Sequence, residues 1–367
     1  MKKPNQAFHG SDLEKIEDIY GIPKDRIVSF SANVNPLGFS QKAAEALKDN
    51  LDIISRYPDR DYIKLREAIS SYTGANPSNI LLGNGVTELL SLFIDVIAPK
   101  KAVIIGPTYS EYEKDLKRCG SEFSYILAQE ETDFVLHAED ILAQTPAKTD
   151  LVILCNPNNP TSGAFLKEDL EKLASAYKET DTWLMIDETY VEFSPISHKI
   201  TAADMTNSYD NLFVLRGTSK FFATPGLRLG YALTGNQDLL YKVTKAQDPW
   251  NINAVADFIG SVMFTDTGYI QSVKHTVEEE KNYVCRELNA IPGVHTYPVY
   301  GNFVLIRLPE GPITSGDLFQ TLIAKGMMIR DCSTFPTLGE RFIRICFMGH
   351  EDNQRLIAAI KEALQTN

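Results

Sequence analysis

The sequence is poor in cysteine and has no long apolar run, and both scarcities narrow the class of protein. Its 367 residues include only five cysteines, and none of them forms a CxxC pair or another spacing typical of a metal site. An odd number of scattered thiols is typical of a reducing compartment. No stretch approaches the length of a membrane span, and the start, MKKPNQAFHG, lacks the apolar core of a signal peptide. We therefore expect a cytoplasmic enzyme without a metal site or a membrane partner.

An excess of positive charge is also missing. The 36 Lys and Arg residues are outnumbered by 48 Asp and Glu residues, which gives a formal net charge of −12. This balance disfavours general binding to nucleic acid or to anionic membranes. It does not restrict the substrate, because a cationic pocket can lie inside an acidic protein. Internal repeats, low-complexity segments and long flexible linkers are absent as well, and the length suggests about two domains.

The remaining chain is organised around residues 214–230, which read VLRGTSKFFATPGLRLG. The apolar run 212–215 predicts a buried strand, and Ser219 and Lys220 follow its end. In open α/β sheets, ligands bind beyond the carboxyl ends of the strands. With Arg228 eight residues further on, the segment suits a phosphorylated aldehyde: the amine forms a Schiff base and the guanidinium binds the phosphate. On these residues alone, a surface lysine after a strand remains an equal alternative.

This segment resembles the Schiff-base lysine motif of fold-type I pyridoxal-phosphate (PLP) enzymes. Within them it is similar to the group of histidinol-phosphate aminotransferases and threonine-phosphate decarboxylases, and the likeness runs through nearly the whole chain. The resemblance implies that Lys220 carries PLP, and that Ser219 and Arg228 bind its phosphate. Three residues before the lysine, where the family usually has a hydroxyl residue, this chain has Gly217.

The expected fold class is α/β. Apolar strands that end in polar residues alternate with helices from about residue 80 to residue 235, which predicts a mostly parallel sheet in an α/β/α sandwich. The resemblance implies a small α+β domain and an N-terminal arm in addition. We assign residues 1–45 to an arm that contributes to the small domain and the substrate mouth, 46–265 to the large PLP-binding domain, and 266–367 to the small C-terminal domain.

Further motifs carry the cofactor contacts that the resemblance implies. The stretch ILLGNGVTE (80–88) places two glycines before a predicted helix, where free backbone N–H groups and the helix dipole favour a phosphate. Two more strands, around 102–105 and 150–154, end in GPTY and CNPNNPTS. By the resemblance, a ring stacks on PLP and an amide bonds the ring oxygen, and a tyrosine reaches the partner's phosphate across a homodimer interface. The cofactor-binding residues expected from these motifs are Gly85, Val86, Thr87, Tyr109, Asn159 and, from the partner subunit, Tyr57.

A fourth strand, 183–186, ends in DETYVEF. The carboxylate of Asp187 at a buried strand end is costly unless it meets a cation, although it could also cap a helix. The resemblance implies that Asp187 keeps the PLP ring nitrogen protonated. Tyr190 is expected near the ring oxygen, so Lys220, Asp187 and Tyr190 form the expected catalytic set. The related motif reads DEAYxEF, so Thr189 replaces an alanine, and Ser162 similarly replaces the glycine of NPNNPTG.

Substrate contacts are expected from both ends of the chain. Arg344 lies in the alternating strand FIRI, and Arg330 precedes it by fourteen residues. Arginines in such strands usually form structural salt bridges, but two that face a pocket supply forked donors for carboxylate or phosphate. The resemblance favours this second interpretation. It also places Asn33 of the loop SANVNPLG (31–38) at the substrate mouth and adds His9, in a His-Gly pair typical of the decarboxylase branch.

The predicted reaction is PLP-dependent decarboxylation of L-threonine O-3-phosphate, or of a close phospho-amino acid such as serine phosphate, to aminopropanol phosphate and carbon dioxide, as in cobalamin biosynthesis. A histidinol-phosphate-type aminotransferase that uses 2-oxoglutarate is the alternative, because both reactions share every cofactor contact. A PLP-binding regulatory domain without turnover is disfavoured. Such regulators carry a basic DNA-binding module, whereas the motifs here begin by about residue 30 of an acidic chain.

Overall fold

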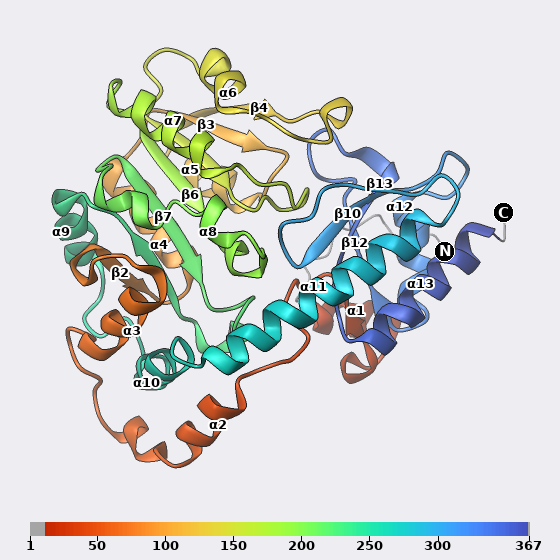
Figure 1. The fold of residues 1–367 in the computed structure, drawn as a ribbon, viewed down its shortest axis with the longest axis horizontal. Helices are drawn as coiled ribbons and strands as arrows, with labels where there is room; N and C mark the ends of the chain where they lie inside the picture. Colours follow the sequence, from red (N-terminus) through yellow and green to blue (C-terminus); the bar gives the residue numbers. More distant parts are fainter. Residues whose placement is uncertain (1–11, 366–367) are drawn as a thin grey trace.

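The computed structural model describes residues 12–365 and is built on a seven-stranded sheet (Figure 1). The strand order is β2-β8-β7-β6-β5-β3-β4. All pairs are parallel except those of β8, which runs antiparallel to both β2 and β7. The strands are β2 (Ile80–Gly83), β3 (Lys101–Gly106), β4 (Glu122–Leu127), β5 (Leu151–Cys155), β6 (Trp183–Asp187), β7 (Leu212–Gly217) and β8 (Gly230–Leu233).

Helices cover both faces of this sheet because each central strand is apolar on both sides. In β5, Ile153 packs in one core cluster with α4 and α5, while Val152 and Leu154 pack in a second cluster with α7 and α10. This two-layered core confirms the expected α/β fold. The helices of this part are α3 (Ile63–Thr73), α4 (Val86–Ile97), α5 (Glu111–Arg118), α6 (Ala138–Gln144), α7 (Lys167–Lys178), α8 (Ser197–Ile200), α9 (Gln237–Ala246) and α10 (Ala254–Met263).

A second, antiparallel sheet has the order β12-β13-β10-β9. Its strands are β9 (His295–Thr296), β10 (Phe303–Arg307), β12 (Arg330–Asp331) and β13 (Phe342–Cys346). The long helix α11 (Thr267–Asn289) runs from α10 beside the large sheet toward the small one, as Figure 1 shows in cyan. It packs there against α13 (His350–Gln365), which also contacts α12 (Ser315–Ile323).

The N-terminal segment returns to the end of the chain. After α1 (Leu13–Tyr20), strand β1 (Val28–Ser29) pairs in parallel with β11 (Met327–Met328). The next helix, α2 (Gln41–Lys48), packs on α10 instead. Residues 28–40 therefore cross from the two-stranded β1–β11 pair to helix α10. The domain boundaries at residues 46 and 266 stay a prediction. No helix within residues 12–365 is both long and apolar enough to cross a membrane.

Candidate active site

Lys220 lies just beyond the carboxyl end of β7, where its amine is enclosed by protein. Nζ donates a hydrogen bond to the carbonyl of Ala32 at 2.7 Å. The residue as a whole is half-buried, but burial of the amino group, and secondarily the positive charge of Arg344, lower its pKa to about 8. A lysine with this pKa has a substantial fraction of free amine near neutral pH, which makes it a competent nucleophile or base.

Asp187 is the last residue of the neighbouring strand β6 and is buried. Its Oδ2 accepts a hydrogen bond from the Tyr112 hydroxyl at 2.7 Å. Its Oδ1 accepts from Thr189 twice, from the backbone N–H at 3.0 Å and from the hydroxyl at 2.5 Å. Burial raises the pKa of Asp187, and these hydrogen bonds oppose that rise. The carboxylate is held in place, as a group that must face a charged ring nitrogen requires.

Residues 31–35, SANVN, form a loop that joins the two halves of the site. The Ser31 carbonyl accepts from the Arg344 guanidinium at 2.7 Å, and the Asn33 amide donates to the Tyr190 hydroxyl at 3.3 Å. The backbone N–H of Asn35 donates to the Lys220 carbonyl at 3.1 Å. This SANVN loop therefore contacts the small sheet, the residues after β6 and the lysine segment.

Arg344 and Arg330 are opposite each other on β13 and β12. Arg344 is buried, yet in residues 12–365 it contacts no carboxylate; its guanidinium donates to the Asn159 side-chain oxygen and the Ser31 carbonyl. Burial lowers the pKa of Arg330, and the charge of Arg344 adds to that effect. The structural salt bridge considered for Arg344 is thus not present. Two adjacent guanidinium groups, of which that of Arg344 is close to Lys220, favour an anionic ligand.

A second cationic region surrounds the start of α4. Gly85, with φ 86°, precedes the helix, and no side chain caps the first N–H groups. A Cβ at Gly85 would collide with the Arg228 guanidinium. Thr87 and Arg228 are exposed, while Val86 and Ser219 are half-buried. Free N–H groups, hydroxyls and a guanidinium at one helix start form a site suited to phosphate.

Gly217, the departure from the family's hydroxyl residue, lies against this same turn. A Cβ there would come within 2.7 Å of Cγ2 of Val86. The next strand is equally close, because a Cβ at Gly230 would lie 2.6 Å from the Val86 nitrogen. A larger residue at position 217 therefore requires a smaller one at position 86, which is the physical reason for the glycine in this chain.

Two expected cofactor contacts stand at different distances from this centre. Tyr109 is half-buried and packs edge-on against Tyr112, with ring centroids 5.7 Å apart, so it belongs to the surroundings of Asp187. Tyr57 is 80% exposed and stacks on Trp250 at 4.7 Å. No described contact joins Tyr57 to the other site residues of its own chain. His9 lies outside the described residues.

Several contacts in the site were not expected from the sequence. Tyr112 lies in the first turn of α5, and no sequence signal placed its hydroxyl at Asp187. Ser162 adopts φ 61°, as the glycine it replaces could, and its hydroxyl accepts from the Gly301 N–H at 3.0 Å. The Ala32 carbonyl has no sequence signal, because every residue carries one.

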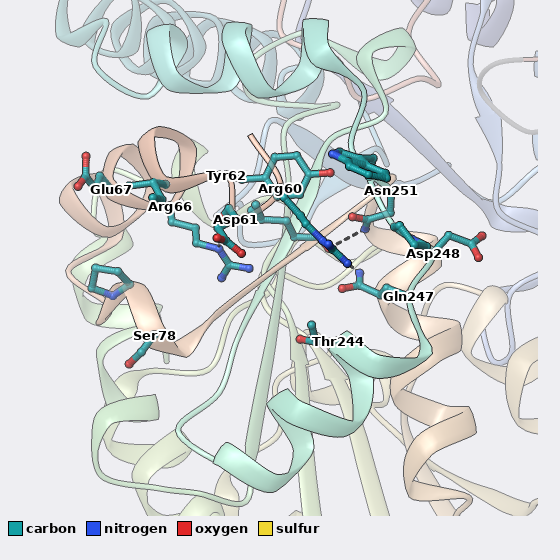
Figure 2. A pocket seen from close by; sticks show the side chains of 15 residues that line it. Arg60, Asp61, Tyr62, Arg66, Glu67, Ser78, Thr244, Gln247, Asp248 and Asn251 are labelled. Atoms are coloured by element: carbon teal, nitrogen blue, oxygen red, sulfur yellow. Dashed lines mark hydrogen bonds between the residues drawn. The ribbon is translucent and has the colours of Figure 1, made fainter. Parts of the chain in front are cut away.

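A surface cavity with a volume of about 610 Å³ lies elsewhere. Figure 2 shows Arg60, Tyr62 and Arg66 on one side of it and Gln247 and Asn251 on another. None of the expected site residues lines this cavity. Trp250, which stacks on Tyr57, is part of its wall. In residues 12–365, no three His, Cys, Asp or Glu side chains cluster closely enough to hold a metal ion.

The family model for aminotransferases of class I and II matches residues 25–360. The chain belongs to this family. It is 33% identical to the threonine-phosphate decarboxylase of Salmonella typhimurium over 358 residues. This alignment covers 98% of this chain and 97% of that one. A structure of histidinol-phosphate aminotransferase from Clostridium acetobutylicum has a TM-score of 0.85 at 30% identity, covering 92% of this chain and 99% of that one. The histidinol-phosphate aminotransferase of Sinorhizobium meliloti, solved with pyridoxal-5'-phosphate, also superimposes with a TM-score of 0.85, over 100% of this chain and 96% of that one; at 21% identity this shows the fold.

Membership of the class I and II family implies PLP as the cofactor and a small, amino-acid-like substrate. The residues present fit PLP. Its aldehyde requires an amine such as that of Lys220. Its phosphate would fit the open turn at Gly85 with Arg228, and its ring nitrogen requires a carboxylate such as that of Asp187. Among the described residues, the buried Nε of Arg344 and Oδ1 of Asn33 have no hydrogen-bond partner, which fits a polar ligand between them.

Proposed function

We propose that this enzyme decarboxylates L-threonine O-3-phosphate or a close phospho-amino acid. The observation that carries this proposal is the pair of arginines on neighbouring strands, Arg330 and Arg344, of which Arg344 is close enough to Lys220 for its charge to lower the pKa of that amine. A phospho-amino acid brings two anions, a phosphate and a carboxylate, and the site offers two guanidinium groups that suit them. The similarity to the Salmonella typhimurium decarboxylase supports the same substrate.

Bound PLP would supply an electron sink for the bond that breaks at the substrate's Cα. The protein's residues would choose which bond that is. Arg344 is fixed by Asn159 and the Ser31 carbonyl, so it would hold one substrate anion in a constant position. Arg330 would hold the other, and together they would prevent rotation about Cα. Asp187 would keep its charge beside the ring nitrogen through Tyr112 and Thr189.

A histidinol-phosphate-type aminotransferase is the second candidate, supported by a specific observation. That reaction requires a base that removes and returns a proton at Cα, and the pKa of about 8 lets Lys220 act as one. The likeness to the Clostridium acetobutylicum structure supports this alternative. Of its two substrates, histidinol phosphate would bring only one anion, its phosphate, to a guanidinium.

The test is incubation of the purified, PLP-loaded enzyme with threonine phosphate without any keto acid, and separately with histidinol phosphate plus 2-oxoglutarate. Release of carbon dioxide in the first reaction supports the decarboxylase. Serine phosphate in place of threonine phosphate measures the contribution of the substrate methyl group. Glutamate formation in the second reaction, with no gas in the first, would make the aminotransferase assignment correct.

We also propose a homodimer in which Tyr57 reaches the phosphate site of the partner subunit. Its ring is 80% exposed and is accompanied by exposed Leu51, Ile54, Ile63 and Trp250. Exposed apolar side chains that lie together, as Tyr57 and Trp250 do, form a cluster typical of a surface that another molecule covers. The cavity in Figure 2 adjoins it through Ile63 and Trp250, so a partner that covers the cluster would also reach the cavity.

A further inference from the structure

The carboxylate of Asp187 has its acceptor positions almost filled. A carboxylate has two oxygens with about four lone-pair sites in total. Oδ1 accepts two hydrogen bonds, both from Thr189, at 3.0 Å from the backbone N–H and 2.5 Å from the hydroxyl. Oδ2 accepts one, from the Tyr112 hydroxyl at 2.7 Å. Oδ1 is therefore saturated by protein, and one open position remains on Oδ2.

The hydroxyl of Thr189 is the decisive part of this arrangement. Any non-proline residue at position 189 would donate the backbone N–H, but alanine, the residue of the related motif, lacks the second donor. Without that donor, Oδ1 would keep a free lone pair, and a ligand N–H could approach either oxygen. The threonine thus restricts where an incoming donor can bind.

The surroundings of Asp187 provide no competing charge. The ionisable groups that face it are Tyr112 of α5, Cys155 at the end of β5, Tyr109 before α5 and Tyr190 after β6. Burial raises the pKa of all four, so they are uncharged near neutral pH. In residues 12–365, Asp187 forms no ion pair. Hydrogen bonds from Thr189 and Tyr112 are therefore what stabilises the charged carboxylate.

We infer that Thr189 is a positioning residue whose hydroxyl closes Oδ1 and makes Oδ2 the single acceptor for a protonated heteroaromatic nitrogen. The inference rests on the proposed binding of PLP, whose ring nitrogen is such a group. Thr189 itself contacts only the carboxylate, so its effect on the ligand passes through Asp187. A hydrogen bond to the charged form of an acid lowers its pKa, so removal of the hydroxyl makes Asp187 easier to protonate.

The experiment compares Thr189→Val, which keeps the branched shape without the hydroxyl, with Thr189→Ser, which keeps the hydroxyl. In protein freed of PLP, the infrared carboxyl band of Asp187 is titrated and assigned by its loss in Asp187→Asn. We expect the midpoint in Thr189→Val to rise by about one pH unit, a tenfold change of the ionisation equilibrium, and Thr189→Ser to titrate like the wild type. After PLP is added back, fluorescence titration should show about tenfold weaker binding in Thr189→Val, with PLP lost at a higher pH as the pH falls.

Thermal unfolding of each variant checks that the fold is intact. Identical titration and identical PLP affinity in Thr189→Val and the wild type would overturn the inference. Equal losses of PLP affinity in the Val and Ser variants would overturn it too, since a role of the hydroxyl requires that serine keep the wild-type behaviour. Wild-type protein that binds no PLP would overturn it together with the cofactor assignment. Failure of the proposed decarboxylation is recognised separately, because it removes carbon dioxide release and leaves both Thr189 measurements unchanged.

Discussion

Lys220 is expected to react with PLP at a pH well below that of an exposed lysine. Its pKa of about 8, against 10.5 for an exposed lysine, results from burial and the charge of Arg344. The rate of covalent PLP capture, followed by borohydride reduction and peptide mapping, should rise with pH around a midpoint of about 8 and label Lys220. Lys220→Ala should bind no PLP covalently and lose turnover. A label on another lysine would contradict the site.

The same shift has a consequence for stability. The folded protein releases the Lys220 proton near pH 8, while the unfolded chain holds it to about 10.5. Because the unfolded state binds more protons between these values, the Lys220 contribution to the free energy of unfolding should rise from pH 8 to pH 10.5. Denaturant unfolding of the PLP-free wild type and Lys220→Met across this range isolates the effect, and a difference that is independent of pH would rule it out.

Asp187→Asn should lower turnover by several orders of magnitude while the fold is kept. The amide has the shape of the carboxylate but no charge to keep the ring nitrogen protonated. Steady-state rates and the PLP absorption spectrum of the variant test this, with circular dichroism as the control for folding. Near-normal rates would mean that the buried carboxylate is only structural.

For single residues, the site side chains at the ends of apolar strands could be predicted from the sequence. The residues that form hydrogen bonds with them could not. Lys220, Asp187 and Asn159 each follow a buried strand, which a sequence shows directly. Tyr112 was missed because its hydroxyl meets Asp187 only in the folded protein, where α5 packs on β3 and β4. Whether the structure's arrangement of Asn33, Arg330 and Arg344 binds substrate stays a prediction.

Among the elements, the contact between β7 and α4 limits what the lysine segment can carry. Gly217→Ser would restore the hydroxyl of the related motif, but its Cβ would meet Val86 at 2.7 Å. We expect it to lower the free energy of unfolding by roughly 1–3 kcal/mol through overpacking. Adding Val86→Ala should recover most of that loss, since it removes the atom that collides. Denaturant unfolding of the two single variants and the double variant measures the coupling between positions 217 and 86. If the changes in the free energy of unfolding simply add, the two positions are not coupled.

The strand pair β12–β13 should control substrate binding. Arg344→Ala removes a buried guanidinium that would meet a substrate anion, at a cost of roughly 2–5 kcal/mol in binding. We expect a sharp rise of KM with PLP still bound, measured by steady-state kinetics and absorbance. Arg355→Ala on α13, an exposed arginine, is the matched control. Loss of PLP from Arg344→Ala would show that its bond to Asn159 serves the cofactor instead.

The long apolar strands were predictable to within a few residues because a strand buried on both faces has apolar residues throughout. The helices were predictable from the period of their apolar residues. The strand β4 was missed, since its residues alternate between exposed and buried, as an edge strand's do. The strands β9, β11 and β12 have two residues each, too few for any pattern. The reversal of β8 follows from the connection after β7, which holds one turn of 3-10 helix at Pro225–Leu227 and no α-helix to support a parallel return.

For the whole molecule, the proposed dimer predicts complementation between inactive subunits. Lys220→Ala and Tyr57→Ala homodimers should each be impaired. In a mixed dimer, one site combines an intact Lys220 with the partner's intact tyrosine, so random mixing should restore about one quarter of the wild-type sites. Subunits mixed after mild denaturation, and assayed beside each variant alone, provide the measurement. No recovery, or a monomer in sedimentation, would exclude the shared site.

The contact between Ser31 and Arg344 joins residues 313 positions apart in the sequence. Strand β1 likewise pairs with β11, which is synthesised much later. During synthesis, the lysine segment and the phosphate turn leave the ribosome long before the strands that complete the site. The early segment must therefore remain without this partner until residue 344 has been synthesised. Chains stalled before residue 327 should leave the SANVN loop open to protease, whereas released full-length chains should protect it. The contact between Ser31 and Arg344 thus forms late in synthesis, although Ser31 itself is synthesised early.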